Sequence, residues 1–383
     1  MSGESQLLQL LRQSPAFRAS QLSYVDQGVA EVEPFPFLAI VGQQEMKLAL
    51  LLAVVNPEVG GVLLLGPRGT GKTTAVRSLT DLLPNRRRSL CPEGCTEELL
   101  EEGGMDAICK ACAQKVGYGE PLTEVDRVRI VNLPLNARLE DVVGGIDERL
   151  ALEQQRVRLE RGLLSHADGH ILYIDEVNML EDAIADAILD AAAQGYYAVR
   201  RGAQKLTYRS RFLLVGSMNP EEGYLRPQLM DRFGLRVIVR GLRDTEERYQ
   251  AYEQAMWYKR DAEGMAGAYS GQTLTLAEEI EAAQTRLPQV TISPAARRLG
   301  LALIHALEVA SSRAEITLFE AARAHAAADE RDTVTVADIG AVALLALRFR
   351  QSSGIKAFLE AQEGEEERVR AFLEREAGMG EEE

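Results

Sequence analysis

The 383-residue sequence has no long hydrophobic run. A helix needs about 20 consecutive apolar residues to cross a bilayer, and no stretch of the sequence approaches that length. The N-terminal sequence, MSGESQLLQLLRQSPAF, also lacks the basic start and the small-residue cleavage site of a secretory signal. We therefore expect a cytoplasmic protein with no membrane span.

Basic charge is scarce as well. The formal net charge is −15, and the segment 360–383 alone carries ten glutamates against three arginines. The only compact basic cluster is Arg86 to Arg88. A protein that binds nucleic acid needs a basic surface to displace counterions from the phosphates. The charge balance therefore argues against a nucleic-acid partner, and it disfavours a DNA-directed motor.

Helical and strand patterns alternate over the first two thirds of the chain. Short, wholly apolar runs are typical of buried parallel strands, and helical stretches between them predict crossover connections. After about residue 243 only helical spacing remains. The expected fold is an α/β parallel-sheet core with a C-terminal all-helical lid. Strands are expected at 61–65, 170–174, 212–216 and 236–239, and helices at 46–55, 74–83, 245–260, 276–286, 294–310, 315–329 and 336–350. The expected domains are an N-terminal extension (1–34), a nucleotide-binding core (35–242), a helical lid (243–352) and an acidic tail (353–383).

The segment Gly66 to Thr73 reads GPRGTGKT and fits the phosphate-loop pattern G-x-x-x-x-G-K-[ST]. It lies between an apolar strand and a predicted helix, which is the context that this chemistry requires. Glycines let backbone N–H groups surround phosphate oxygens, and the helix N-terminus adds partial positive charge. We expect Lys72 to reach the β- and γ-phosphates of ATP, and the Thr73 hydroxyl to ligate Mg²⁺. The expected ATP-binding residues are Gly66, Gly69, Thr70, Gly71, Lys72, Thr73 and Thr74.

Two acidic residues end the second apolar strand, whose sequence from Ile171 to Glu176 is ILYIDE. At the carboxyl end of a core strand, Asp175 is placed to hold Mg²⁺ through water, so Thr73 and Asp175 form the expected Mg²⁺ site. The next residue, Glu176, is placed to polarise the water that attacks the γ-phosphate. The sequence therefore predicts ATP hydrolysis as well as ATP binding.

The third apolar strand leads to Asn219, which is expected to position the attacking water; a simple Asn-Pro turn is the alternative. The segment 225–234, LRPQLMDRFG, supplies an arginine that could reach the γ-phosphate of a neighbouring subunit. Such an arginine finger neutralises charge that develops in the transition state. We expect Arg232 in this role, with Arg226 as the second candidate and a surface ion pair with Asp231 as the alternative.

Several stretches outside the phosphate loop are quite specific. They are Phe35 to Gln43 (FPFLAIVGQ), Glu45 to Leu50 (EMKLAL), Asn219 to Gly223 (NPEEG) and Asp231 to Gly234 (DRFG). With these motifs, the sequence from about residue 35 to residue 350 resembles the ATPase subunit (I subunit) of magnesium chelatase, a member of the AAA+ superfamily.

The resemblance implies a hexameric AAA+ ring that acts with an integrin-like-domain subunit and a porphyrin-binding subunit. Together these would use ATP to insert Mg²⁺ into protoporphyrin IX in (bacterio)chlorophyll biosynthesis. It also implies an insertion at about 133–164 and a β-hairpin at 196–209. Two more site residues follow from it: Val41 at the nucleotide, and the lid residue Arg313 at the γ-phosphate, although Arg313 could simply be a helix-start arginine.

Two segments depart from the family pattern. Residues 136–141 read NARLED where the family usually has G-A-T-E-D-R, and residues 160–164 read ERGLL where it has E-P-G-L-L. Both lie in the insertion that is expected to face partners, so a MoxR-like remodelling chaperone or a cobalt-chelatase-type ATPase acting on an integrin-like-domain partner stays open. With one Trp and four scattered His, nothing in the chain resembles a porphyrin pocket.

All four cysteines lie within one segment, 89–114, with the spacing C-x₃-C-x₁₃-C-x₂-C. Two close pairs separated by a loop are typical of a tetrahedral thiolate site, whose usual occupant is zinc. Disulfides are disfavoured in the cytosol. We expect a Zn²⁺ site that folds a local insert, with an iron–sulfur or redox role and unliganded thiols as the alternatives. The expected ligands are Cys91, Cys95, Cys109 and Cys112.

Overall fold

The computed structural model describes residues 33–91, 94–145, 161–201, 204–223 and 225–350. The expected N-terminal extension and acidic tail lie almost wholly outside these residues, as do residues 146–160 of the expected insertion. In the part of the chain that is described, no helix is both long and apolar enough to cross a membrane.

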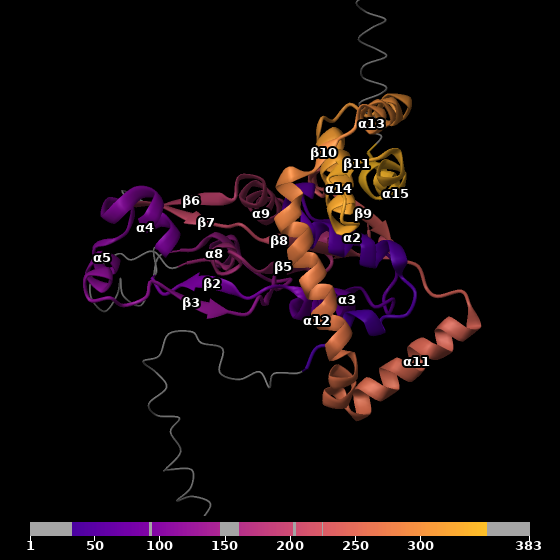
Figure 1. Cartoon of the computed structure of the whole chain (residues 1–383), viewed down its shortest axis with the longest axis horizontal. Coiled ribbons are helices and arrows are strands. Elements are labelled where there is room, and N and C mark those ends of the chain that lie inside the picture. Colours follow the sequence, from indigo (N-terminus) through magenta and orange to yellow (C-terminus); the bar gives the residue numbers. More distant parts are fainter. Residues whose placement is uncertain (1–32, 92–93, 146–160, 202–203, 224, 351–383) are drawn as a thin grey trace, which may run out of the picture. The chain divides into compact units, whose positions relative to one another are not determined.

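Within the described residues, five parallel strands form the central sheet, in the order β4-β5-β8-β1-β9. Figure 1 labels three of them, β5, β8 and β9. The four strands predicted from the sequence are all present. The fifth, β4, was not predicted, because its three residues are too few to show a pattern and are at most half-buried at the sheet edge. The strands are β1 (Val62–Leu65), β4 (Ile130–Asn132), β5 (Ile171–Ile174), β8 (Leu213–Met218) and β9 (Leu235–Ile238).

Both faces of the sheet are buried. Successive side chains of a strand point to opposite faces, so Val62 and Leu64 pack on one side of β1 while Leu63 and Leu65 pack on the other. The first face contributes to an apolar cluster that includes residues from the lid. This two-sided burial is why the strand sequences read as continuous apolar runs rather than as an alternation.

The helices of the core connect its strands. The helix expected at 74–83 is in fact shorter: α3 ends at Arg77, and a 3₁₀ segment covers Ser78–Leu82. The predicted helix 46–55 is confirmed with two extra residues at its start. The core helices are α2 (Gln44–Val55), α3 (Lys72–Arg77), α6 (Leu139–Val143), α8 (Leu163–His166), α9 (Asp182–Gln194) and α10 (Pro227–Arg232).

The lid consists of five helices and a two-stranded parallel ribbon among the described residues. The helix expected at 276–286 in fact begins at Ala262, since the glycines at 264, 267 and 271 do not interrupt it. Both predicted helix starts are confirmed: Ser293 Oγ accepts the Ala296 N–H at 3.2 Å, and Thr335 with Asp338 forms a capping box. The lid elements are α11 (Thr245–Arg260), α12 (Ala262–Arg286), α13 (Pro294–Ala306), α14 (Arg313–Ala328), α15 (Val336–Leu347), β10 (Thr291–Ile292) and β11 (Thr333–Val334).

Two antiparallel strand pairs lie outside the central sheet. The hairpin expected at 196–209 is confirmed as β6 (Tyr196–Arg201) and β7 (Gln204–Arg209). The other pairs β2 (Arg86–Ser89) with β3 (Thr123–Asp126). In the sequence, α4 (Glu97–Gly103) and α5 (Lys110–Gly117) come between these strands, and Figure 1 shows both helices to the left of the strand pair. The cysteine-bearing insert therefore spans 86–126 and is longer than the expected 89–114.

Candidate nucleotide site

The phosphate loop joins β1 to α3. Gly69 and Gly71 have positive φ angles of 78° and 84°, which side chains with a Cβ rarely adopt. A Cβ at either position would meet no other atom within 4 Å, so both glycines border open space. At Gly66 a Cβ would lie 2.1 Å from the Val239 carbonyl oxygen, so this position requires glycine for a packing reason. The loop fits a phosphate chain, whose oxygens need backbone N–H groups that no side chain covers.

Lys72 is the first residue of α3, and its side chain folds back over the loop. Its Nζ donates hydrogen bonds to the carbonyl oxygens of Gly66 at 2.7 Å and Pro67 at 2.8 Å. Burial lowers the pKa of Lys72, while the nearby charges of Asp175 and Glu222 oppose that change. A phosphate near this ammonium group would favour its charged form for the same electrostatic reason.

Oxygen atoms from three strands or helices meet beside the loop. The Thr73 hydroxyl lies 3.0 Å from the Tyr173 hydroxyl, which donates to Asp175 Oδ1 at 3.2 Å. The Ser217 hydroxyl, from β8, also donates to Asp175 Oδ1. The two residues expected to hold Mg²⁺ are thus joined through one intervening hydroxyl group. Hydroxyl and carboxylate oxygens are the hard ligands that Mg²⁺ prefers, so the donor set fits this ion.

Glu176 follows Asp175 and adopts a left-handed backbone conformation, with φ of 54°. Its Oε1 accepts a hydrogen bond from Arg68 Nη2 at 2.7 Å, and Arg68 Nε lies 2.8 Å from Glu222 Oε1. The Arg68 side chain is 73% exposed, whereas the two carboxylates are 21% and 25% exposed. An exposed arginine of the phosphate loop therefore bridges two more sheltered acids.

Asn219 is buried at the end of β8, and its side chain has two partners. Its Nδ2 donates to Glu222 Oε1 at 2.9 Å, and its Oδ1 accepts the Glu221 N–H at 3.3 Å. The second hydrogen bond belongs to the local Asn-Pro turn that was the alternative for this residue. The first connects Asn219 to Glu222, which Arg68 links to Glu176. The Asn219 hydrogen bond, followed by the charge of Arg68, lowers the pKa of Glu222.

Both candidate finger arginines form ion pairs with α9 of the same chain. Arg232, the last residue of α10, pairs with Asp190, and Arg226, the residue before α10, pairs with Asp182. The Arg232 side chain is 29% exposed. Asp231, the partner considered from the sequence, instead faces the lid.

Arginines from both the core and the lid lie close to the Asp231 carboxylate. Arg350 Nη1 donates to its Oδ1 at 3.1 Å, and Arg236 Nη2 lies 3.8 Å from the same oxygen. Arg313, at the start of α14, lies 4.0 Å from Oδ2. Burial lowers the pKa of Arg236 to about 9, and the neighbouring Arg350 charge acts in the same direction. The residue before Arg232 is therefore in direct contact with the lid.

Val41 lies half-buried in the turn that precedes α2. The two following residues have positive φ angles, and Gln43 Nε2 donates to the Arg240 carbonyl at 2.7 Å. Arg240 directly follows Val239, which packs against Gly66. The Val41 turn is thus tied to the strand end that adjoins the phosphate loop.

Comparison with known proteins identifies the family. An AAA domain of the dynein-related subfamily matches residues 121–233, and an AAA lid domain matches residues 302–371. The chain is 40% identical over 316 residues to the magnesium-chelatase subunit ChlI homolog of Methanocaldococcus jannaschii, covering 82% of this chain and 85% of that protein. It is 42% identical over 319 residues to magnesium-chelatase subunit ChlI of Synechocystis, covering 82% and 88%. The chain belongs to the magnesium-chelatase ChlI family.

Membership of the ChlI family makes this chain an AAA+ ATPase that uses ATP with Mg²⁺. The fold agrees: a putative ATPase from Cytophaga hutchinsonii superposes with a TM-score of 0.53 at 20% identity, covering 84% of this chain and 87% of that one. The predicted α/β AAA+ fold with a helical lid is confirmed.

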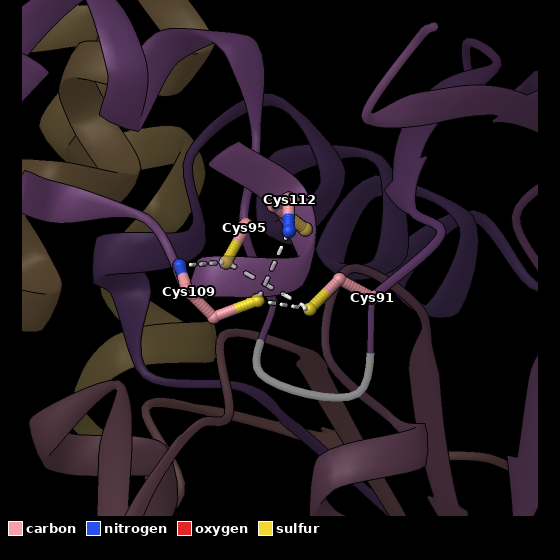
Figure 2. A group of neighbouring side chains, drawn as sticks. All are labelled: Cys91, Cys95, Cys109 and Cys112. Carbon is pink, nitrogen blue, oxygen red and sulfur yellow. Dashed lines mark hydrogen bonds between the residues drawn. The ribbon is translucent and has the colours of Figure 1, made fainter. Parts of the chain in front are cut away.

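The four cysteines of this ChlI-family chain lie on the 86–126 insert. Their Sγ atoms all lie within 4.8 Å of one another, and three of the residues are buried (Figure 2). The fold thus brings together the four cysteines that the sequence spacing predicted to form one site.

Three contributors to the nucleotide site were missed from the sequence. They are Arg68, which occupies a variable position of the phosphate-loop pattern, Glu222, which lies within the NPEEG motif, and Asp231, which was considered only as a partner of Arg232. Clustering of acids after a core strand was the available signal for Glu222. Arg68 and Asp231 act through contacts with residues far away in the sequence, which spacing does not reveal.

Proposed function

We propose that this chain is the ATP-hydrolysing motor subunit of a magnesium chelatase, which drives Mg²⁺ insertion into protoporphyrin IX in (bacterio)chlorophyll biosynthesis. About 40% identity to ChlI proteins over more than four fifths of both chains carries the proposal. The site described above supports it, because phosphate loop, Mg²⁺ ligands and water-activating acid adjoin one another.

In this proposal the phosphate loop binds the nucleotide through the backbone N–H groups of 66–73 and through Lys72. Lys72 exchanges its bonds to the Gly66 and Pro67 carbonyls for bonds to the β- and γ-phosphates. Thr73 and Asp175 hold Mg²⁺, directly and through water. The ion supplies charge neutralisation at the β- and γ-phosphate oxygens.

Glu176 orients and polarises the attacking water, and Asn219 helps to position it. Arg68 lies on Glu176 in this structure, so this role requires the arginine to move. The arginine is exposed and held by surface ion pairs, which contribute little to stability. The negatively charged nucleotide can therefore displace Arg68 at a small cost in free energy.

Hydrolysis further requires two arginines at the γ-phosphate. We propose that Arg313 reaches it from the lid of the same chain, and that Arg232 reaches it from the next subunit of a homo-oligomeric ring, a hexamer. Arg232 must then exchange Asp190 for the neighbour's nucleotide. A finger supplied in this way makes each site dependent on two subunits.

The chelatase reaction itself requires partners. We propose that the ring acts on an integrin-like-domain subunit and a porphyrin-binding subunit, in the cytoplasm and without nucleic acid. This proposal requires ATP and Mg²⁺ but no Zn²⁺, because the four cysteines lie on the 86–126 insert and none belongs to the nucleotide site.

Reconstitution tests the chelatase role. The purified chain is expected to hydrolyse ATP alone but to insert no Mg²⁺ into protoporphyrin IX until both partner subunits from the same organism are added. Porphyrin fluorescence measures insertion, and phosphate release measures hydrolysis. Restoring G-A-T-E-D-R at 136–141 is expected to raise insertion with partners from a standard chelatase.

ATP hydrolysis without any insertion of Mg²⁺, with folded native partners in excess, would refute the magnesium chelatase. Insertion of Co²⁺ into a corrin-type substrate under the same conditions would support a cobalt-chelatase-type ATPase instead. ATP hydrolysis with insertion of neither Mg²⁺ nor Co²⁺ would point to a remodelling chaperone.

A further inference from the structure

We propose that Cys91, Cys95, Cys109 and Cys112 bind one zinc ion, and that this ion holds the 86–126 insert in its folded form. The proposal does not depend on the chelatase role, because it rests on residues outside the nucleotide site.

The sulfur positions have the dimensions of a single-ion site. Cys91 Sγ lies 3.8 Å from Cys95 Sγ and 3.5 Å from Cys109 Sγ, and all four sulfurs lie within 4.8 Å of one another. With zinc–sulfur bonds of about 2.3 Å, tetrahedral geometry places the sulfurs about 3.8 Å apart. Figure 2 shows the four side chains close together, with Cys109 and Cys112 coming from the start of α5. The group has room for one ion at its centre.

Backbone N–H groups already point at two of the sulfurs. The Cys109 N–H donates to Cys95 Sγ at 3.3 Å, and the Cys112 N–H donates to Cys109 Sγ at 3.4 Å. Hydrogen bonds to ligand atoms orient them and stabilise the thiolate form that a metal ion requires. These donors favour a thiolate site over a cluster of neutral thiols.

The packing of the insert gives an independent argument. Among its described residues, the buried apolar cluster comprises three of the cysteines together with Ile108 and Leu122. The helix α4 buries none of its residues, and α5 buries only Cys112. Units of about 40 residues rarely fold on so small a core without disulfides or a metal ion. The sulfur atoms occupy the place where a core would otherwise be.

The rest of the insert is built around the cysteine turns. Ser89 Oγ donates to the Cys95 carbonyl at 2.6 Å and accepts the Cys91 N–H at 3.1 Å. Glu97 accepts hydrogen bonds from the backbone N–H groups of Leu122 and Thr123 at 2.9 and 3.1 Å, which closes the insert against β3. Metal binding and the folding of this segment are therefore expected to be one event, with zinc replacing the thiol protons.

Metal analysis of the purified full-length chain tests the proposal. We expect about one zinc ion per chain, little iron, and an insert that resists proteolysis. Removing zinc with a strong chelator under reducing conditions is expected to open cleavage sites within 86–126, and added Zn²⁺ is expected to close them again. Replacement by Co²⁺ is expected to give the visible absorption bands of a tetrahedral thiolate complex.

Two neighbouring serine variants provide a matched comparison. Cys112→Ser removes a buried ligand and is expected to lose most of the zinc and the protease resistance. Ala111→Ser places the same side chain on the adjacent, exposed position of α5 and is expected to keep both. Nucleotide binding by each variant reports whether the core remains folded.

Three results would overturn the proposal. They are wild-type protein that contains no zinc yet keeps a protease-resistant insert, iron in place of zinc after growth with both metals, and disulfide-bonded cysteines under reducing conditions. A fourth is equal zinc content in Cys112→Ser and Ala111→Ser, because it would show that Cys112 is not a ligand. None of these results would affect the ATPase assignment.

Discussion

At the scale of single residues, one arginine beside the phosphate loop bridges two carboxylates. Glu176 and Glu222 both contact Arg68, but only Glu222 also accepts a hydrogen bond from Asn219. Glu222 is thus held in place by two groups. Glu176 accepts no hydrogen bond from Asn219, and its ion pair is with the exposed Arg68, so it is the acid that is more easily released to bind water.

Substitution separates the roles of these two acids. Glu176→Gln is expected to bind ATP with normal affinity and to lose about 10²-fold or more in turnover, because the amide cannot take up a proton. Glu222→Gln, the matched control, is expected to lose less than about tenfold by the same reasoning. Nucleotide binding by fluorescence and turnover by phosphate release measure the two effects. Equal losses in the two variants, or a fully active Glu176→Gln, would contradict the assignment of the water-activating acid.

The phosphate loop and the two strand-end acids were predictable because their spacing is dictated by a local chemistry. A phosphate loop needs glycines and a lysine at fixed offsets, and a core strand presents its last residues at the sheet edge. The positions of Arg68 and Asp231 were not predictable in this way. Arg68 follows β1 and contacts Glu176, which follows β5. Asp231 contacts Arg350, which is 119 residues away in the sequence.

At the scale of elements, the lid is fastened by a buried carboxylate. Asp338, in the first turn of α15, is fully buried and accepts hydrogen bonds from Arg331 at 2.7 Å and from the Thr335 N–H at 2.7 Å. His325 Nδ1, on α14, lies 2.7 Å from the other carboxylate oxygen. One side chain thus caps its own helix and joins it to the preceding helix and turn.

Asp338→Asn is expected to destabilise the lid by about 2–3 kcal/mol, because it removes the buried one of the two carboxylates that pair with Arg331. The matched control is Asp329→Asn, an exposed carboxylate that also pairs with Arg331 and should cost less than about 1 kcal/mol. Hydrogen exchange of α14 and α15 measures both effects. Indistinguishable exchange rates in the two variants would show that the buried network does not stabilise the lid.

The same carboxylate makes lid stability depend on pH. Burial alone would raise the pKa of Asp338, but hydrogen bonds from Arg331, Thr335 and His325 outweigh burial and hold the pKa well below its usual range. A depressed folded-state pKa means that its contribution is complete above the unfolded pKa of about 4 and is lost as the pH falls below it. Wild-type lid exchange is expected to accelerate below that pH more steeply than in Asp338→Asn. Parallel pH profiles would contradict this.

Elements were predicted best where one periodic pattern runs between clear boundary signals. The predicted helix 245–260 matches α11 at both ends, and Ser293 and Thr335 begin helices as expected. The first half of α12 was missed because three glycines disfavour a helix in isolation, and tertiary contacts override that preference. The edge strand β4 is too short to leave any pattern.

At the scale of the whole molecule, the proposed ring requires complementation between subunits. Arg232→Ala is expected to bind ATP normally and to lose about 10³-fold in turnover, because it lacks the finger. Mixed with inactive Glu176→Gln protein in equal amounts, it should regain activity at about one quarter of the interfaces, where an intact Glu176 faces an intact Arg232. Absence of rescue at every mixing ratio, in rings verified by light scattering, would contradict a shared site.

The order of strands in the central sheet also has a consequence for protein synthesis. The strand β1 lies between β8 and β9, which are the last two strands of the sheet in the sequence. A nascent chain therefore exposes β1 without β8 until residue 218 has left the ribosome, and without β9 until residue 238 has done so. The strands β2 and β3 pair with each other within 86–126, and this pair is complete roughly 110 residues before β9. During translation, the cysteine insert precedes the nucleotide-binding core that it interrupts.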